Sequence, residues 1–510
     1  MGTTTARPKA VILGIDGGSL ELIEPLVAEG VLPCLGALLA GSAYGTTTTT
    51  WPAHTAPGWS TFVSARQPGG HGIYQFFDTQ DPGYGDRLLG TADFGCTTVW
   101  EWLAQQGYSV GLINVPMSHP PRDLPGYQVT WPLEQTLRYS SPSGLLGELA
   151  RAGAPFKPDI AAMFRGDLGY LDFALEHIRA RTRSIRYLMT HHPVDVVMAV
   201  ITEIDRICHH YWHFCDPCHP HHEEPARAGW ANAIRSSYVA LDDAFAEILE
   251  LVGDEVPVLL VSDHGFGAGR GSIAVNVALA EAGLLSTRAD GPGRYASWFH
   301  AEGQAVDFGR TRAYMPTPGC YAVNVNLAGR QREGIVAERD APAVLAEAAE
   351  LFLDLRAADT GDRVFRAALP REEAYPGVMC RSAPDLLLVP ADEGVLASSD
   401  IRGPVWRPSE QTGLHRYAGM WALRCPELPT GRYDSSVALV DLAPTLLHEL
   451  GLRFPASVHG RPLAEALRSG RDPLPFLTDA AAAPALVRDS ARHLRDDDLT
   501  TKTLSAMGYL

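Results

Sequence analysis

The chain has 510 residues, of which 46% are hydrophobic and 20% are charged, and its formal net charge is −17. The length exceeds one average domain, and the composition is that of a globular protein rather than a disordered or fibrous one. The acidic balance argues against non-specific binding to nucleic acid or to an anionic membrane, because the summed field repels phosphate groups. Lysine occurs only at positions 9, 157 and 502, so a bound phosphate must depend on metal ions or on a few arginines.

Three further features bear on the location of the protein. No apolar run approaches the roughly 20 residues that a membrane-spanning helix requires. The N-terminus is polar, with no secretory hydrophobic segment, and the eight cysteines are scattered along the chain, which favours reduced thiols. We therefore expect a cytoplasmic protein that binds neither nucleic acid nor membrane, while the sequence does not indicate an oligomeric state.

The expected elements alternate between buried strands and helices. The first strand covers 10–15 and ends at Asp16, and a helical pattern from 20 to 39 follows, interrupted by Gly30 and Pro33. Helix and strand pairs then recur at 97–106 and 109–113, 168–190 and 194–201, and 229–252 and 256–261, before a late strand at 419–424. Strands separated by helices predict an α/β fold, with a central, mostly parallel sheet flanked by helices on both faces. In such sheets, ligands bind beyond the carboxyl ends of the strands.

Two irregular stretches interrupt this alternation. Residues 116–166 carry many prolines and glycines, and residues 286–340 are also irregular. We interpret both as insertions that form a cap over a site rather than as independent domains. The sequence thus predicts one large domain over 8–465, followed by a C-terminal tail over 466–510.

Carboxylates and imidazoles recur where the expected strands end. They are Asp16, Asp205, His209, Asp263, His264 and His415. Asp205 and His209 are four residues apart, so on a helix they share one face. Mixed aspartate and histidine ligation suits zinc or a similar transition metal. Three carboxylates and one deprotonated hydroxyl carry four negative charges, which two divalent cations would neutralise.

The stretch 46–62 is rich in hydroxyl groups and precedes the segment His71-Gly72-Ile73. A hydroxyl at a helix N-terminus beside a metal ion would have its alkoxide stabilised by the ion and by the helix dipole. This stretch is therefore expected to supply a nucleophile.

In this order the motifs resemble the alkaline phosphatase superfamily, in its type I phosphodiesterase / nucleotide pyrophosphatase family. That family shows a strand ending in Asp-Gly, a threonine nucleophile about sixteen residues before His-Gly-Ile, an Asp-x-x-x-His pair, Asp-His-Gly and a late histidine. The segments 439–447 and 460–463 also resemble the end of the family's domain. The resemblance implies an alkaline-phosphatase-like fold.

The resemblance also implies a mechanism. Thr55 would be the nucleophile, with Thr50 and Ser60 as the alternatives. Two divalent metal ions, zinc or else manganese, would be held in two groups, by Asp205, His209 and His415 and by Asp16, Asp263 and His264, with Thr55 bridging to the second ion. Attack by Thr55 would give a phospho-threonine intermediate on a small, nucleotide-like phosphodiester or phosphoanhydride.

Substrate contacts and other functions are less tightly defined. Gly58 stands where the family usually carries asparagine, and we expect it to face the substrate with Tyr74 and Phe76, whose rings could stack on a base or sugar. A phosphomonoesterase would need extra cations, for which Arg66, Arg122 and Arg416 are the candidates. The remaining alternatives are a non-catalytic phosphate-ligand binding protein and metal buffering by the histidine-rich stretch 208–222.

Overall fold

The computed structural model describes residues 7–477, except 85–86, 133–135, 137, 159–168, 226, 289–305, 410, 465–466, 468–469 and 473. Nearly all of the predicted tail, 466–510, therefore lies outside the described residues, as do parts of the two predicted insertions. How the chain divides into domains stays a prediction.

A nine-stranded sheet forms the main body, with the strand order β18-β2-β17-β7-β1-β6-β3-β4-β5. Its strands are β1 (Ala10–Ile15), β2 (Ala43–Thr48), β3 (Val110–Ile113), β4 (Gly126–Val129), β5 (Ser140–Ser141), β6 (Val196–Ile201), β7 (Val258–Val261), β17 (Ala418–Arg424) and β18 (Gly431–Ala438). Only β17 and β5 run antiparallel to their neighbours. The predicted, mostly parallel sheet is confirmed.

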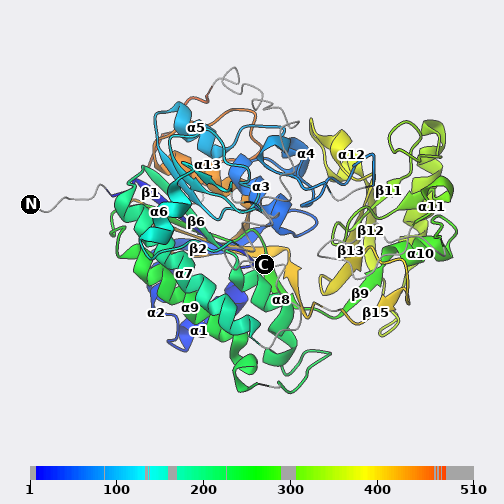
Figure 1. The fold of residues 1–510 in the computed structure, drawn as a ribbon, viewed down its shortest axis with the longest axis horizontal. Helices are drawn as coiled ribbons and strands as arrows, with labels where there is room; N and C mark the ends of the chain where they lie inside the picture. Colours follow the sequence, from blue (N-terminus) through cyan, green and yellow to red (C-terminus); the bar gives the residue numbers. More distant parts are fainter. Residues whose placement is uncertain are drawn as a thin grey trace, which may run out of the picture.

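Helices cover both faces of this sheet (Figure 1). One face carries α1 (Leu20–Ala28), α2 (Pro33–Ala40), α7 (Tyr170–His191), α8 (Glu203–Cys215) and α9 (Ala233–Leu249), and the other carries α3 (Thr55–Ser64), α5 (Val99–Gln105) and α13 (Leu439–Glu449). The alternation of side chains along β1 explains the two layers. Val11, Leu13 and Ile15 enter the core under the first set of helices, whereas Ala10 and Ile12 enter the core under the second.

The helical pattern at 20–39 forms two helices rather than one. Gly30 adopts a φ of +76° just after α1, and Pro33 is the first residue of α2. A left-handed residue ends a helix, and proline starts one without losing a needed N–H donor. Among the described residues, no single helix is long and apolar enough to cross a membrane; α1 and α2 pass that test only as a pair bent by 106°.

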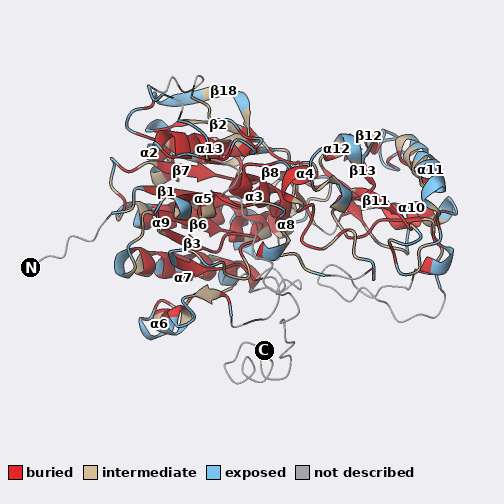
Figure 2. Cartoon of the chain, turned by 90° about the horizontal axis from the view of Figure 1, so that it is seen from above, coloured by how far each residue is buried: buried red, intermediate tan, exposed pale blue. Residues whose placement is uncertain are grey.

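A second lobe lies beside the main body, as Figures 1 and 2 show. It runs from β9 (Gly271–Ala274) to β15 (Trp406–Arg407) and has its own hydrophobic core. Its other elements are α10 (Val275–Glu281), β10 (Ala313–Tyr314), β11 (Ala322–Val325), α11 (Ala341–Asp354), β12 (Phe365–Pro370), α12 (Arg371–Ala374), β13 (Leu386–Pro390) and β14 (Val395–Ser398). The irregular range 286–340 lies inside this larger lobe. The described part of 116–166 contributes β4 and β5 to the main sheet, followed by α6 (Leu145–Arg151).

The remaining elements connect these parts. β8 (Gly265–Ala268) and β16 (Gly413–Arg416) form a two-stranded antiparallel sheet where the chain leaves and re-enters the main body. Helix α4 (Pro68–His71) follows α3, and short 3-10 turns occur at Thr91–Asp93, Ala228–Asn232, Phe308–Arg310, Glu338–Asp340 and Cys380–Ser382. The expected helix at 229–252 is thus a 3-10 turn followed by α9.

Candidate active site

Three neighbouring parallel strands deliver acidic and imidazole side chains to one edge of the sheet. Asp16 directly follows β1, and Asp263 and His264 lie in the turn between β7 and β8. β6 leads within two residues into α8, which carries Asp205 and His209. Because β7, β1 and β6 are adjacent and parallel, their carboxyl ends meet, and the five side chains converge.

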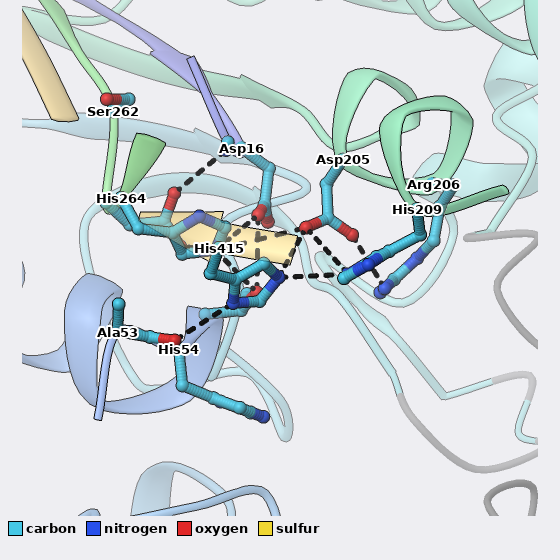
Figure 3. A network of polar contacts seen from close by, with 12 residues as sticks. Asp16, Ala53, His54, Asp205, Arg206, His209, Ser262, His264 and His415 are labelled. Atoms are coloured by element: carbon cyan, nitrogen blue, oxygen red, sulfur yellow. Dashed lines mark hydrogen bonds and ion pairs between the residues drawn. The ribbon is translucent and has the colours of Figure 1, made fainter. Parts of the chain in front are cut away.

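His415 and Thr55 reach the same place from other elements. His415 lies on β16, opposite Phe266 of β8. Thr55 is the first residue of α3, and the preceding His54 caps that helix by accepting a hydrogen bond from the Ala56 N–H on its Nδ1 at 3.2 Å. Dashed lines in Figure 3 join His415 to Asp205 and to His209.

The Thr55 hydroxyl is buried against Asp16 and His264. Its Oγ1 donates to Asp16 Oδ1 at 3.2 Å and lies 3.3 Å from His264 Nε2. The other oxygen of Asp16 accepts from the Trp59 indole N–H at 3.3 Å. Trp59 fits here because Gly14 has no side chain: a Cβ on Gly14 would lie 2.6 Å from the indole ring. The carboxylate beside the hydroxyl is therefore held in one orientation.

Asp205, His209 and His415 form one compact group. The Asp205 Oδ1 lies 3.4 Å from His209 Nε2 and 3.0 Å from His415 Nε2, and the two Nε2 atoms are 2.9 Å apart. Arg206 donates from Nη1 to Asp205 Oδ2 at 2.8 Å. Sequence analysis did not single out Arg206, although its place next to Asp205 was a usable signal.

Asp16, Asp263 and His264 form a second group beside the first. His264 Nε2 is 3.5 Å from Asp16 Oδ1 and 3.2 Å from Asp263 Oδ2. The Gly17 N–H donates to Asp263 Oδ1 at 3.2 Å, whereas the buried Asp263 Oδ2 finds no hydrogen-bond partner among the described residues. The groups adjoin, because the His264 and His415 rings stack with centroids 3.6 Å apart. His264 also satisfies the spacing of a ligand in a set with Asp205 and His415.

The three imidazoles are oriented as metal ligands usually are. Each Nδ1 lies within hydrogen-bond distance of a main-chain carbonyl: His209 of Gly413 at 2.8 Å, His264 of Gly265 at 3.1 Å and His415 of Ala53 at 3.0 Å. A carbonyl only accepts, so these bonds assign the proton to Nδ1 and the lone pair to Nε2. Nitrogen lone pairs that face each other and a carboxylate repel unless a cation lies between them. The donor set therefore fits a divalent ion.

The carboxylates differ in their electrostatic surroundings. Burial, together with the charges of Asp16 and Asp205, holds the pKa of Asp263 well above its usual range. Burial also raises the pKa of Asp205, but His209 and Arg206 outweigh it and hold that pKa well below its usual range. Burial and the neighbouring His415 keep the pKa of His264 low. A cation in the second group would offset the repulsion that raises the pKa of Asp263.

The three predicted substrate contacts lie in different surroundings. Gly58 packs beneath Asp263, since a Cβ there would lie 3.0 Å from Asp263 Cβ and 3.1 Å from its carbonyl oxygen. A side chain at this position would require Asp263 to shift by a few tenths of an ångström. Phe76 lies near the site, with its ring centroid 4.8 Å from that of His54, which is 6.0 Å from the ring of His415.

Tyr74 is engaged with the second lobe. Its hydroxyl donates to the Met379 carbonyl at 2.7 Å, and its ring packs edge-on against Tyr375 with centroids 4.9 Å apart. Gly58 and Phe76 thus lie by the cluster, and Tyr74 lies in the contact between the lobes. The substrate-binding role of all three stays a prediction.

Of the alternative residues, Thr50 and the three arginines have structural contacts of their own, whereas the buried Ser60 hydroxyl finds no hydrogen-bond partner among the described residues. The Thr50 hydroxyl donates to the Pro52 carbonyl at 3.0 Å. Arg66 bonds to Ser457 and to the Ser64 carbonyl, Arg122 to Glu101 and the Thr91 carbonyl, and Arg416 to the carbonyls of Ala268, Glu393, Leu414 and His415. The three arginines considered for a phosphomonoesterase are therefore already hydrogen-bonded within the protein.

The histidine-rich stretch holds the chain that leads to His415. His213 Nδ1 contacts the Thr412 hydroxyl, His219 Nε2 contacts the Thr412 carbonyl and His221 Nε2 contacts the Arg270 carbonyl, each at 2.9 Å. These rings fasten the segment after α8 to the start of β16 and to the residue before β9. Each of these contacts has a structural role.

Taken together, a mostly parallel α/β sheet and a buried Asp, His and Thr cluster at its carboxyl edge define a phosphoric ester hydrolase of the alkaline phosphatase superfamily. The chain belongs to the type I phosphodiesterase / nucleotide pyrophosphatase family, whose sequence model matches residues 10–418. The predicted family and fold are thus confirmed, and the family is metal-dependent. No curated protein sequence matches the chain.

Solved structures share the fold at low sequence identity. Human ectonucleotide pyrophosphatase/phosphodiesterase 5 is 12% identical, with a TM-score of 0.53 over 90% of this chain and 99% of that one. An inactive variant of the murine enzyme, in complex with AMP, is also 12% identical, with a TM-score of 0.51 over 87% of this chain and 95% of that one. Phosphonoacetate hydrolase from Sinorhizobium meliloti 1021, in complex with phosphonoacetate, is 13% identical, with a TM-score of 0.55 over 88% of this chain and 96% of that one.

Proposed function

We propose that this protein hydrolyses a phosphodiester or phosphoanhydride bond in a small, nucleotide-like substrate through a phospho-threonine intermediate on Thr55. The observation that carries this proposal is the position of the Thr55 hydroxyl, buried at the first residue of α3 between Asp16 and His264. The AMP bound by the murine relative and the phosphonoacetate bound by the bacterial one support a small phosphorylated ligand. A cytoplasmic location stays a prediction.

The proposal includes two divalent ions, zinc or manganese. Asp205, His209 and His415 would hold one, and Asp16, Asp263, His264 and Thr55 would hold the other. When bound, such ions neutralise the buried carboxylates, polarise the phosphoryl group and favour deprotonation of a hydroxyl or a water. The carbonyl contacts of the three Nδ1 atoms support this assignment, because they leave each Nε2 free to bind an ion.

The remaining chemical steps depend on the side chains of the protein and on helix α3. Asp16 orients the Thr55 hydroxyl and lies where it can receive its proton. The Thr55 oxygen attacks phosphorus, the bond to the leaving group breaks, and the leaving oxygen takes a proton from water. Water then attacks the phospho-threonine, the bond between phosphorus and the Thr55 oxygen breaks, and the hydroxyl regains a proton. The N-terminus of α3 stabilises the negative charge that develops beside it.

The first experiment compares hydrolysis of bis-p-nitrophenyl phosphate and p-nitrophenyl phosphate, with zinc or manganese added and then removed by a chelator. We expect metal-dependent turnover that favours the diester, a loss of at least about a thousandfold in Thr55→Ala, and partial activity in Thr55→Ser. Intact-mass analysis after rapid acid quenching of the reaction with bis-p-nitrophenyl phosphate should show one p-nitrophenyl-phosphoryl group on the wild type, because only one nitrophenolate leaves in the first step, and none on Thr55→Ala.

Two outcomes would contradict the proposal. Thr55→Ala with an unchanged melting temperature and wild-type turnover would remove Thr55 as the nucleophile. A preference for the monoester would instead indicate a phosphomonoesterase on the same cluster, although the engaged Arg66, Arg122 and Arg416 argue against it.

A further inference from the structure

An aromatic stack adjoins the candidate active site and takes no part in the proposed chemistry. The rings of Trp51 and Tyr417 are stacked, with centroids 4.9 Å apart and planes 11° apart. Trp51 precedes Thr55 by four residues, and Tyr417 follows His415 by two. The stack therefore joins the segment just before α3, which begins with the candidate nucleophile, to the residue just after β16, which carries a candidate metal ligand.

Arg366 of the second lobe completes this stack. Its guanidinium carbon lies 5.4 Å from the centroid of the Trp51 ring, within the range of a cation–π contact. The second lobe also contacts Trp51 through Tyr375, whose hydroxyl donates to the Trp51 carbonyl at 3.3 Å. A cation from one lobe is thus set against an aromatic ring of the other, beside the loop that leads to Thr55.

A β-bulge places Arg366. Strand β12 is the edge of its sheet, and its register with β13 shifts between the pairs Phe365 with Pro390 and Ala367 with Val389. Arg366 is therefore the extra residue in the ladder, and it is exposed. Bulges redirect a side chain and recur next to active sites.

The guanidinium of Arg366 makes no hydrogen bond or ion pair with the part of the chain that the structure describes. The arginines beside the cluster differ: Arg206 bonds to Asp205, and Arg416 bonds to main-chain carbonyls. A cation–π contact uses no N–H donor, so the N–H groups of the Arg366 guanidinium stay available for a bidentate anion. In a chain of net charge −17, such a cation is a local point of attraction for an anion.

We propose that Arg366, held by Trp51, binds a second anionic group of the substrate, a phosphate or a carboxylate other than the phosphoryl group that Thr55 attacks. This inference rests on the proposed function and narrows its substrate class to phosphoryl compounds with two anionic groups. Four residues of extended chain separate the Cα atoms of Trp51 and Thr55 by at most about 14 Å, which sets the aromatic stack in the neighbourhood of the candidate nucleophile. Arg366 then selects substrates, and the catalytic groups act on them.

The test measures binding rather than turnover, by calorimetry on metal-loaded Thr55→Ala and on Thr55→Ala with Arg366→Gln. ADP is compared with AMP, and phosphonoacetate with methylphosphonate, so each pair differs by one anionic group. We expect Thr55→Ala to bind the doubly anionic member of one pair about fivefold or more tighter, and Arg366→Gln to bring that ratio close to one.

The ligand pair whose binding ratio falls in Arg366→Gln identifies the anionic group that Arg366 binds. Loss of the ADP to AMP ratio assigns a phosphate, and loss of the phosphonoacetate to methylphosphonate ratio assigns a carboxylate. If Arg366→Gln changes neither ratio, the proposal is wrong. Arg366→Lys, which keeps the charge without the planar fork, should retain part of the preference.

Arg339→Gln is the matched control, since Arg339 is an arginine of the same lobe with 87% of its side chain exposed, and its change should leave both ratios intact. The binding ratios do not depend on catalysis. Turnover that survives in Thr55→Ala would overturn the proposed function while the ratios still report on Arg366.

Discussion

Trp59 lies one helical turn after Thr55, and its indole N–H holds the carboxylate that contacts the candidate nucleophile. The ring is fully buried and occupies the space that Gly14 leaves open in β1. The donor that orients Asp16 thus comes from the same helix as Thr55. The orientation of the Asp16 carboxylate decides whether the Thr55 hydroxyl can donate to it, because a hydrogen bond weakens steeply with angle and distance.

We predict that Trp59→Phe lowers kcat on bis-p-nitrophenyl phosphate by about tenfold and the free energy of unfolding by about 1–3 kcal/mol. The substitution keeps an aromatic ring but removes the N–H that Asp16 accepts. The control is Trp102→Phe in α5, which removes an indole donor to the Thr97 hydroxyl at 2.9 Å. We expect a similar loss of stability there without the loss of kcat, and equal kcat values in the two variants would contradict the role of Trp59.

At the scale of elements, α4 is held to α3 by a buried neutral histidine. His71 Nε2 lies 3.0 Å from the Thr61 hydroxyl, and His71 Nδ1 accepts from the Ile73 N–H at 3.1 Å. Burial, helped by the positive charge of Arg66 and by His459, lowers the pKa of His71 to about 3. His71 thus holds the loop after α3 together, and its neutral form is the one that fits.

This pKa predicts a dependence of stability on pH. The unfolded chain has a histidine pKa of about 6.5, so between about pH 6.5 and 3 it binds a proton that the folded protein does not. Stability should therefore fall as the pH drops below about 6.5, with His71 contributing a loss of about 2 kcal/mol between pH 7 and 5. Urea unfolding at the two pH values checks this, and His71→Gln should show a smaller difference. The same pH dependence in both proteins would disprove the assignment.

At the scale of the whole molecule, the two candidate metal groups join elements that are distant in the chain. Asp16, Asp205 and Asp263 follow three different strands, and His415 comes after the whole second lobe in the sequence. Their convergence places several negative charges in a buried space, where like charges destabilise the fold. Ion binding would then stabilise the molecule as a whole.

We predict that a chelator lowers the melting temperature and that zinc or manganese restores it. At an ion concentration a hundredfold above Kd, binding adds about 2.7 kcal/mol to the free energy of unfolding for each site. Asp263→Asn supplies the internal control, because a neutral amide suits the environment that raises the pKa of Asp263. Without metal this variant should melt above the metal-free wild type, and added metal should shift it less. A melting temperature unaffected by metal in the wild type would contradict the assigned ligands.

Local pattern was enough to predict most of the main body. The apolar run 10–15 is β1 with the predicted bounds, and the helices and strands expected around 97–113, 168–201 and 229–261 all form, with ends that shift by a few residues. Parallel strands end at a common edge, which is why Asp16, Asp205 and Asp263 could be expected to meet. The first and last residues of each helix and strand depend on tertiary contacts, which a local sequence pattern does not contain.

The sequence by itself determined the fold class, the family and the residues at the ends of β1, β6 and β7, because hydrophobic periodicity and short motifs are local properties of the chain. Tertiary structure decided the rest. Only in the folded chain does β16 pair with β8 and bring His415 to Asp205. The same folding places Gly58 against Asp263 and Tyr74 against Met379. The contact of Arg366 with Trp51 joins two lobes through a bulge, and no pattern near either residue encodes it. Contacts between residues hundreds of positions apart depend on the packing of whole layers, which is settled only when the chain has folded.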